Sequence, residues 1–228
     1  MKPIFTHYGR REILLCSTVC ASACFALAAA ARGIHPLWAI GLVVPGTLWA
    51  WVLWFFRDPQ RDTPQGKGLL IAPADGVVTD ITQVGDRSPL GCDGVKIGIF
   101  MSVFDVHVNR SPAEARVVKV EHVEGLFLDA RDENAGEKNE SATIHLTIEN
   151  DKGESLPLVV RQVAGLIARR IVTDLQPGQH IQRGERIGMI KFGSRLEIFV
   201  PTQLVHKVLV APGQKTRAGL TVLATSGE

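Results

Sequence analysis

Two apolar segments near the N-terminus constrain what this chain can fold into more than any other feature of its sequence. From Ile13 to Ala31 no residue is charged, and a second apolar run extends from Leu37 to Phe56. Each run is about long enough to cross a bilayer as a helix, and the break between them is short. The sequence therefore predicts a transmembrane hairpin within residues 1–60, with spans at about 13–31 and 37–56.

The first run has an alternative interpretation as a secretory signal peptide. Arg10 and Arg11 precede it, and it ends in the small residues Ala28–Ala31. The second run argues against this interpretation, because tryptophans lie mostly toward its ends, where aromatic side chains favour the membrane interface. They are Trp38, Trp49, Trp51 and Trp54. A helical hairpin accounts for both runs.

Basic residues predict the orientation of the hairpin. Three of them precede the first segment: Lys2, Arg10 and Arg11. Three follow the second segment, namely Arg57, Arg61 and Lys67, whereas only Arg32 lies between the two segments. Positive residues favour the cytoplasmic side, so we expect both ends of the hairpin, and the domain that follows, to be cytoplasmic at the cell (inner) membrane. The formal net charge of +2 is too small to indicate a nucleic-acid-binding protein.

The cysteines do not indicate a disulfide framework or a zinc site. Cys16, Cys20 and Cys24 follow one another at four-residue spacing in the first apolar segment, so they line one helical face as small apolar residues. Cys92 is alone in the rest of the chain, which fits a reducing compartment.

Residues 61–228 are predicted to form a β-rich catalytic domain. Short β-branched runs alternate there with glycine and proline, as is typical of strands separated by turns. The expected strands are 76–82, 95–100, 115–123, 141–148, 156–163, 186–191, 196–201 and 206–210. The fold class is therefore mainly β, an antiparallel sandwich or barrel.

Two further segments refine this expectation. Ala72–Val78 and Gln176–Gly188 resemble the barrel-sandwich hybrid of lipoyl and biotinyl carriers, in which the two halves of the sandwich come from distant segments. That fold would place residue 75 near residue 194. Apolar residues at helical spacing predict one short helix over 163–174, and the polar stretch 129–140 is interpreted as a long surface loop.

Asp75, His107 and Ser194 offer an acid, a base and a nucleophile. Serine is a poor nucleophile until a histidine accepts its proton, and a carboxylate can hold that histidine in the right tautomer. Ser194 follows Gly193, whose carbonyl can be approached closely because glycine has no Cβ. Taken singly, each residue also suits an ordinary turn, strand or loop position, so these residues alone leave both interpretations open.

As a set, the motifs of this chain resemble those of the phosphatidylserine decarboxylases, in particular the short bacterial and archaeal type. The resemblance covers nearly the whole chain and begins with the hydrophobic hairpin. Its motifs are Phe56–Pro59, Ala72–Gly76, Phe104–Pro112, Asn139–Glu140, Gln162–Ile171 and Phe192–Ser194.

The resemblance implies a proenzyme that cleaves itself between Gly193 and Ser194 into a β chain and a smaller α chain, residues 1–193 and 194–228. In this scheme His107, held by Asp75, takes the proton of Ser194 as its hydroxyl attacks the Gly193 carbonyl. Ser194 then becomes a pyruvoyl group at the start of the α chain.

The implied reaction is that of a carboxy-lyase. The pyruvoyl group derived from Ser194 would form a Schiff base with phosphatidylserine and act as the electron sink for its conversion to phosphatidylethanolamine and carbon dioxide, without metal or pyridoxal phosphate. His107 is the expected proton donor to the substrate carbon. The hairpin would keep the domain at the membrane, within reach of the lipid headgroup. A homodimer stays an open possibility.

Two positions depart from longer members of the family. Phe104 stands where those members carry a second histidine, so a role of that histidine cannot be transferred. Arg195 follows the Gly-Ser pair, where a small or hydroxylated residue is common. Its charge could assist the substrate carboxylate or phosphate, or it could be a solvated loop residue. Arg57 and Arg61 are interpreted as topology anchors rather than headgroup ligands.

Two other functions compete with this interpretation. A membrane-tethered carrier or adaptor of the biotinyl type would use Lys191 as its modified residue, but Lys191 falls at a predicted strand end rather than at a hairpin tip. A serine hydrolase would usually present its nucleophile in a Gly-x-Ser-x-Gly elbow, which the sequence lacks. Neither alternative explains Asp75, His107 and the Gly193–Ser194 peptide together.

Overall fold

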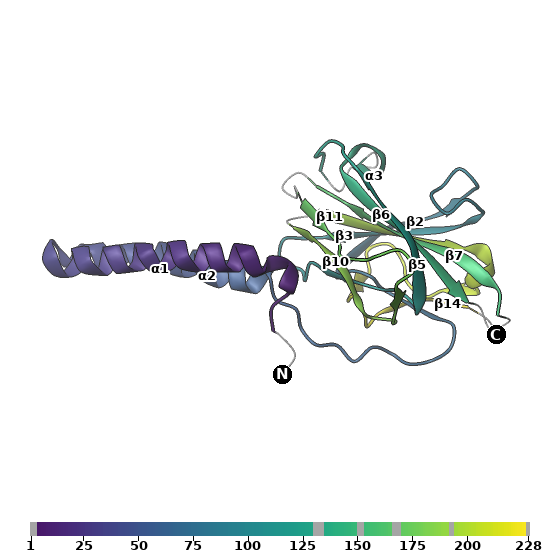
Figure 1. Cartoon of the computed structure of the whole chain (residues 1–228), viewed down its shortest axis with the longest axis horizontal. Helices are drawn as coiled ribbons and strands as arrows, with labels where there is room; N and C mark the ends of the chain where they lie inside the picture. Colours follow the sequence, from purple (N-terminus) through teal and green to yellow (C-terminus); the bar gives the residue numbers. More distant parts are fainter. Residues whose placement is uncertain (1–3, 130–134, 150–152, 166–169, 192–193, 227–228) are drawn as a thin grey trace. The chain divides into compact units, whose positions relative to one another are not determined.

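The computed structural model describes residues 4–129, 135–149, 153–165, 170–191 and 194–226 of the 228-residue chain. Its internal packing divides the chain into two compact units, Met1–Gln60 and Arg61–Glu228. The first unit is helical and the second is built mainly of strands (Figure 1).

In its described residues, the first unit contains two long helical segments that pack against each other. Its elements are the 3-10 helix η1 (His7–Gly9), helix α1 (Arg10–Gly33), the 3-10 helix η2 (Pro36–Leu42) and helix α2 (Val43–Phe55). The Trp49 indole N–H donates a hydrogen bond to Ser17 Oγ at 2.9 Å, which joins α2 to α1. Nearer the break, a Cβ at Gly41 would lie 3.0 Å from a methyl group of Leu27. The predicted pair of N-terminal apolar helices is thus confirmed.

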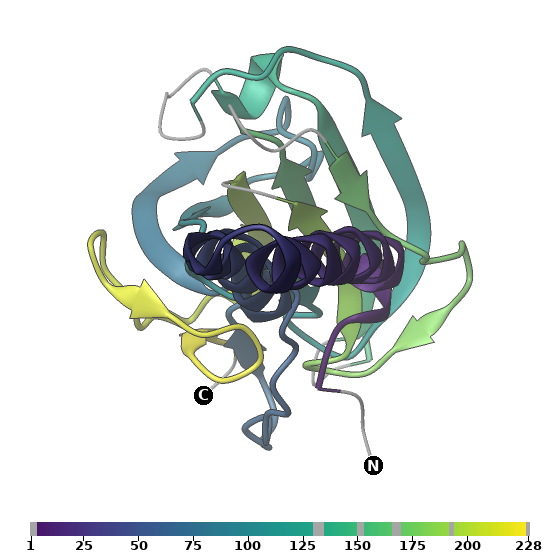
Figure 2. The same ribbon diagram turned by 90° about the vertical axis from the view of Figure 1, so that its left-hand side faces the viewer.

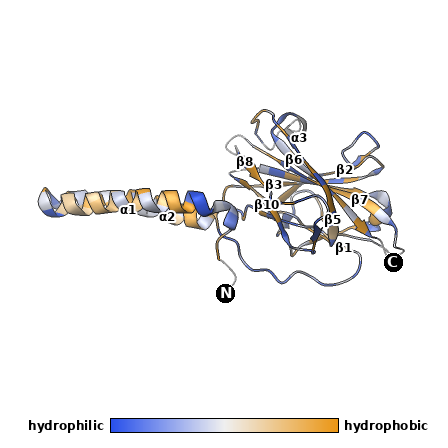
Figure 3. Ribbon diagram, in the orientation of Figure 1, coloured by the Kyte–Doolittle hydropathy of each residue, from blue (hydrophilic) through white to orange (hydrophobic). Residues whose placement is uncertain are grey.

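Both helical segments are long and apolar enough to cross a membrane. His7–Gly33 has a mean hydropathy of 2.2 and Pro36–Phe55 one of 1.6 over their most apolar stretches. Figure 3 colours most of both helices from pale to orange. Large apolar side chains such as Phe25 and Ile40 are exposed on their surfaces. Side chains of this kind favour a lipid environment over water, so the helices favour membrane association.

The described part of the second unit contains three antiparallel sheets. Its elements are β1 (Leu69–Ile71), β2 (Gly76–Val84), β3 (Gly94–Met101), β4 (Val108–Arg110), β5 (Ala115–Val123), α3 (Ala135–Lys138), β6 (Ser141–Glu149), β7 (Ser155–Val163), β8 (Arg170–Val172), β9 (His180–Ile181), β10 (Arg186–Lys191), β11 (Ser194–Pro201), η3 (Thr202–Leu204), β12 (Lys207–Val208), β13 (Lys215–Thr216) and β14 (Val222–Thr225). The largest sheet has the order β13-β2-β3-β11-β7-β6-β5-β9. The smaller sheets are β4-β10-β8 and β1-β14-β12.

The large sheet curls around the main hydrophobic core, as Figure 2 shows for β2 and β5 at its two sides. Strand β11 lies in its centre, paired with β3 along its whole length and with β7 over its first part. Alternate residues of β11 point to opposite faces. Leu196 and Ile198 join the main core, while Phe199 joins a smaller cluster with Leu90 and Val159.

The strand predictions are largely confirmed. Six of the expected strands match β2, β3, β5, β6, β7 and β10 to within two residues at each end. The strand expected at 196–201 begins earlier, at Ser194, and the one expected at 206–210 is reduced to Lys207–Val208. The mainly antiparallel β class is therefore correct, because alternation of apolar residues reports the burial of one face of each strand.

The predicted helix over 163–174 is wrong in the described part of that range. Val163 is the last residue of β7, and Arg170–Val172 forms strand β8, whereas residues 166–169 lie outside the described ranges. Ile171 pairs with Ile190 of β10, so tertiary pairing overrides the helical spacing of a short apolar run. The expected loop over 129–140 contains the short helix α3, and its residues 130–134 also lie outside the described ranges.

Candidate active site

Ser194 is the first residue of β11 and is fully buried. It pairs with Met101 of β3, and its side chain points to the same face as Leu196, toward the main core. Within the described residues, Ser194 Oγ has no hydrogen-bond partner. The expected strand begins at residue 196, whereas in the structure this central strand begins at Ser194. Gly193, the other half of the predicted cleavage site, lies outside the described residues.

His107 is also fully buried and lies directly before strand β4. Its Nδ1 lies 3.0 Å from the backbone carbonyl oxygen of Asp105. A carbonyl oxygen only accepts hydrogen bonds, so Nδ1 carries the proton and Nε2 is the basic nitrogen of the neutral ring. The carboxylate of Asp105 accepts a hydrogen bond from the Ser102 amide at 2.8 Å, which closes the turn that presents this carbonyl.

A chain of buried side chains connects β4 to the strands on either side of Ser194. Asn109, two residues after His107, places its Nδ2 3.5 Å from the sulfur of Met101, the residue opposite Ser194. Gln162 of β7 donates from Nε2 to Asn109 Oδ1 at 2.8 Å. The fold therefore brings the segment that carries His107 against both neighbours of the strand that begins at Ser194.

Asp75 lies in the turn before β2, and its carboxylate is held by Arg61. Both terminal nitrogens of the guanidinium donate to it, one of them at 2.8 Å, and the Ala218 amide donates at 2.7 Å. The Arg61 side chain is only 6% exposed. Arg61 is therefore a buried partner of Asp75 and not a solvated topology anchor, which corrects the interpretation from sequence.

The predicted hydrogen bond from His107 to the Asp75 carboxylate is not formed in this structure. Within the described residues, the partners of that carboxylate are Arg61 and Ala218, and the carbonyl of Asp105 fixes the tautomer of His107 instead. The Arg110 amide nevertheless donates to the Pro73 carbonyl at 2.9 Å, so the turn that carries Asp75 does lie beside β4. Sequence placed the right segments together but assigned a different partner to the carboxylate.

Arg195 points away from Ser194, to the opposite face of β11. It is 5% exposed, and it donates from Nη2 to Asp80 at 2.5 Å and from Nε to Glu197 at 3.0 Å. It is thus a buried strand residue, and its guanidinium is engaged by two carboxylates. Lys96 adds a further cation 3.2 Å from Asp80.

The charges around Asp80 shift the pKa of its carboxyl group. Burial acts to raise the pKa of the Asp80 carboxyl, but a hydrogen bond from Thr79 and the charges of Arg195 and Lys96 outweigh it, so the pKa lies below its ordinary value. Asp80 therefore stays ionised and continues to pair with Arg195 in mildly acidic solution.

Comparison with known proteins shows the family of this chain. The family model described as phosphatidylserine decarboxylase matches residues 48–224. The chain belongs to the phosphatidylserine decarboxylase family. A phosphatidylserine decarboxylase proenzyme of Symbiobacterium thermophilum is 44% identical over 198 residues, which cover 87% of this chain and 88% of that protein. One of Geobacter sulfurreducens is 49% identical over 177 residues, 78% of each chain, and one of Zymomonas mobilis is 39% identical over 220 residues, 85% of this chain and 87% of that protein.

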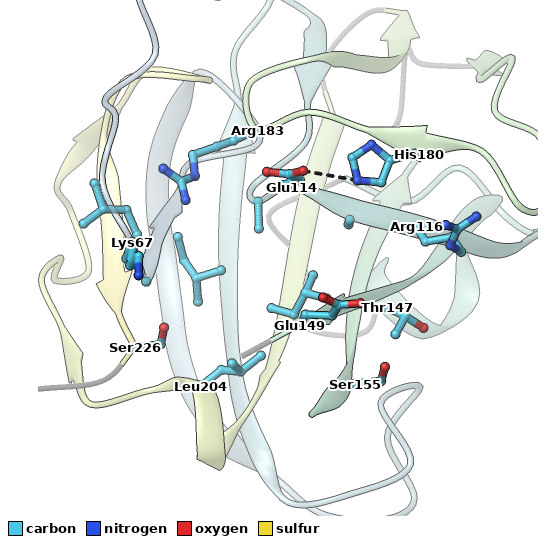
Figure 4. Close-up of a pocket in the computed structure, with 16 residues that line it drawn as sticks. Lys67, Glu114, Arg116, Thr147, Glu149, Ser155, His180, Arg183, Leu204 and Ser226 are labelled. Atoms are coloured by element: carbon cyan, nitrogen blue, oxygen red, sulfur yellow. Dashed lines mark ion pairs between the residues drawn. The ribbon is translucent and has the colours of Figure 1, made fainter. Parts of the chain in front are cut away.

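Figure 4 shows a cavity of about 600 Å³ in this family member, and Ser194 is not among the described residues that line it. It is lined in part by Glu149 and Ser155, which pair at one end of the β6-β7 hairpin. The start of β11 meets the other end, where Val163 pairs with both Ser141 and Arg195. An ion pair at 3.2 Å between His180 and Glu114 crosses part of the cavity wall. The cavity is therefore separate from the residues that connect His107 to Ser194.

Sequence reasoning on this decarboxylase missed three residues that shape the site: Arg61, Asn109 and Gln162. Each stood inside or beside a motif that the sequence singles out, but none was assigned a contact. Gln162 did carry a signal, because it is a polar residue in a strand of apolar neighbours and its position alternates onto the core face. Arg61 carried none, since its partner is 14 residues away and only the tertiary fold brings them together.

Proposed function

We propose that this protein decarboxylates phosphatidylserine to phosphatidylethanolamine and carbon dioxide, using a pyruvoyl group that it makes from its own Ser194. The observation that carries the proposal is the setting of Ser194: a fully buried hydroxyl, without a hydrogen-bond partner among the described residues, at the first position of a central strand. Family membership supplies the reaction class, and the relatives named above are described as proenzymes.

The residues present fit a precursor of this kind. Ser194 Oγ attacks the Gly193 carbonyl carbon, the peptide C–N bond breaks, and an ester forms in its place. His107 accepts the hydroxyl proton at Nε2, the nitrogen left basic by the hydrogen bond from Nδ1 to Asp105, and passes it to the Ser194 nitrogen as the C–N bond breaks. Loss of the Ser194 α-proton then expels the Gly193 carboxylate. Addition of one water and release of one ammonia complete the keto group at residue 194.

The fold explains how the two products of cleavage stay together. The α chain, residues 194–228, begins with β11, and this strand is paired on both sides with strands of the β chain, residues 1–193. These ladders do not include the bond that is cut. The new end of the α chain therefore remains inside the sheet, beside Met101 and the amide pair of Asn109 and Gln162.

The keto group, once formed, supplies an electrophile that condenses with the lipid amine and an electron sink for the pair released as carbon dioxide leaves. His107 holds the proton that returns to the substrate carbon, because it is the buried base on the segment packed against the two strands that flank the Ser194 strand. Asp75 contributes to maturation through the turn beside β4 that it anchors to Arg61.

The substrate is a membrane lipid, and the apolar helices of the first unit are consistent with a membrane-bound enzyme. Two apolar helices long enough to span a bilayer would place the enzyme at the cell (inner) membrane, with the catalytic unit on the cytoplasmic side, as the basic residues at both ends of the hairpin favour. The competing carrier function is not supported by Lys191, which is 5% exposed and therefore unsuited to carry a group between partners.

Intact-mass measurement of purified full-length protein tests the proposal. The wild type should give two chains whose summed mass equals that of the precursor plus one water minus one ammonia, and the smaller should begin with a blocked residue 194. Ser194→Ala should give one uncleaved chain, while the matched Ser155→Ala, at an exposed strand position, should be cleaved normally. A folded wild type that stays in one piece would refute the proposal.

A chemical trap distinguishes this function from those of a carrier and a hydrolase. With phosphatidylserine present, reduction by cyanoborohydride should attach the lipid amine covalently to the chain that begins at residue 194. A lipid amine bound to Lys191, or no adduct on a protein that is fully cleaved, would contradict the pyruvoyl mechanism.

A further inference from the structure

Near the proposed cleavage point, the fully buried polar atoms Ser194 Oγ and Gln162 Oε1 have no hydrogen-bond partner within the described residues. Buried polar atoms without partners are rare in folded proteins, and each needs an explanation. Maturation explains the hydroxyl of Ser194, because that hydroxyl is consumed. The Gln162 carbonyl oxygen takes no part in cleavage as derived above, so it remains unexplained.

The strand register places Gln162 next to residue 194. Gln162 lies directly opposite Leu196 across the β7-β11 pair, and Leu196 lies two residues after Ser194. Residues two apart on a strand share a face, so the side chains of Gln162 and Ser194 lie on the same face as diagonal neighbours. That diagonal is within reach of a side chain as long as glutamine.

The neighbouring hydrogen bonds fix which way the Gln162 amide points. Asn109 uses its Nδ2 on the sulfur of Met101 at 3.5 Å, which leaves Asn109 Oδ1 to face Gln162. Gln162 must therefore present Nε2 to Asn109, at 2.8 Å, and its carbonyl oxygen is left as an acceptor without a partner among the described residues. The backbone of Gly188 also packs closely against this amide, because a Cβ at Gly188 would lie 3.0 Å from Gln162 Nε2.

We propose that Gln162 Oε1 accepts a hydrogen bond from the amino group of the lipid when that amine lies at residue 194. The inference rests on the proposed function, since an amine must approach residue 194 to react there. An ammonium or amine N–H that enters a fully buried site loses its water and needs an acceptor. Gln162 is thus a substrate-binding residue for primary amines, held in place by Asn109.

Binding of two soluble short-chain lipids to the matured protein tests this assignment. One is dihexanoyl phosphatidylethanolamine. The other is the analogue of this lipid that carries a propyl group in place of the ethanolamine, so that a methyl group replaces the ammonium. Wild type should prefer the amine. Gln162→Met keeps the side-chain length but has no acceptor comparable to an amide oxygen, and it should lose roughly ten- to hundred-fold of that preference, the range expected for a hydrogen bond to a charged group.

Two matched variants complete the experiment. Gln162→Glu keeps an oxygen acceptor and should retain the preference for the amine, with the Asn109 amide turned so that its Nδ2 donates to the new carboxylate. Gln83→Met makes the same chemical change at an exposed position of β2 and should behave as the wild type. Titration calorimetry gives the affinities, and intact mass reports the cleavage of each variant in the same preparations.

The outcomes separate this inference from the proposed function. Cleaved Gln162→Met with wild-type amine preference would overturn the inference alone, and an uncleaved wild type would overturn the proposed function. Gln162→Met that melts as the wild type but stays uncleaved would also overturn the inference, because Gln162 would then act in cleavage. If Gln162→Met does not fold, Gln162→Glu decides: loss of amine preference in that variant contradicts the assignment, and its retention supports it.

Discussion

The Arg61 guanidinium binds both carboxylate oxygens of Asp75. Arg61 is the first residue of the β-rich unit, and Asp75 ends the turn that leads into β2. Arg61 also donates to the carbonyl of Ala218, whose amide donates to Asp75, so three distant segments share one buried site. Paired contacts of this kind are among the stronger charge-assisted hydrogen bonds.

We predict that Arg61→Met destabilises the protein by about 3–5 kcal/mol, because it leaves the Asp75 carboxylate buried without its cation. Arg61→Met combined with Asp75→Leu should cost less than the sum of the two single changes. Thermal melting of the four proteins in a double-mutant cycle measures this coupling. Additive effects would show that the two side chains contribute independently.

His107 is predicted to be required for self-cleavage. Loss of a positioned base costs about 10²–10⁴-fold in rate, so His107→Ala should remain largely uncleaved over the time in which the wild type matures fully. His122→Ala, at an exposed position of β5, serves as the matched control and should be cleaved normally. The cleaved fraction is followed on denaturing gels, and normal maturation of His107→Ala would remove His107 from this step.

The Asp80–Arg195 pair should make part of the stability depend on acid pH. The folded-state pKa of Asp80 lies below its ordinary value, so its contribution is complete above the unfolded-state pKa of about 3.9 and is lost as the pH falls through the lower folded-state value. When the pH falls below about 3.9, the melting temperature of Asp80→Asn should therefore decrease less than that of the wild type.

An exposed aspartate provides the control for that experiment. Asp86→Asn removes a carboxylate of the same type from the turn after β2, where the side chain is exposed. Its acid-induced fall in melting temperature should equal that of the wild type. If Asp80→Asn and Asp86→Asn behave alike, the buried pair with Arg195 makes no specific contribution to acid stability.

The alternation of apolar and polar residues allowed most strands to be predicted, because it follows from the burial of one face of a strand. The strand Ala115–Val123 was predicted to the residue, as its buried and exposed positions alternate at its start. The helix expected over 163–174 was wrong because a short apolar run fits either period, and pairing with β10 decides between them. Arg61 could not be assigned to Asp75 from sequence, since a basic residue after an apolar segment has the same appearance whether it faces water or a buried carboxylate.

Contacts within the site were harder to predict than the residues themselves. Asp75, His107 and Ser194 were singled out by type and setting, and the fold brings their segments together around β3 and β4. However, His107 donates its hydrogen bond to the backbone carbonyl of Asp105, and every residue type has such a carbonyl, so the sequence gives no sign of this contact. Backbone partners of this kind become visible only when the turn that presents them is known.

Gly76, which follows Asp75, is predicted to tolerate no side chain. Its φ is +152°, and a Cβ would lie 2.1 Å from the carbonyl oxygen of Phe100, the β3 residue that pairs with Arg195. Gly76→Ala must displace this backbone, so it should cost more than about 2 kcal/mol and slow the cleavage before Ser194. Gly178→Ala isolates backbone strain alone, because Gly178 has φ +85° and no atom within 4 Å of the added Cβ; it should cost about 1–2 kcal/mol and leave cleavage unchanged. Melting temperatures and the cleaved fraction compare the two variants, and equal losses would mean that the contact with Phe100 relaxes freely.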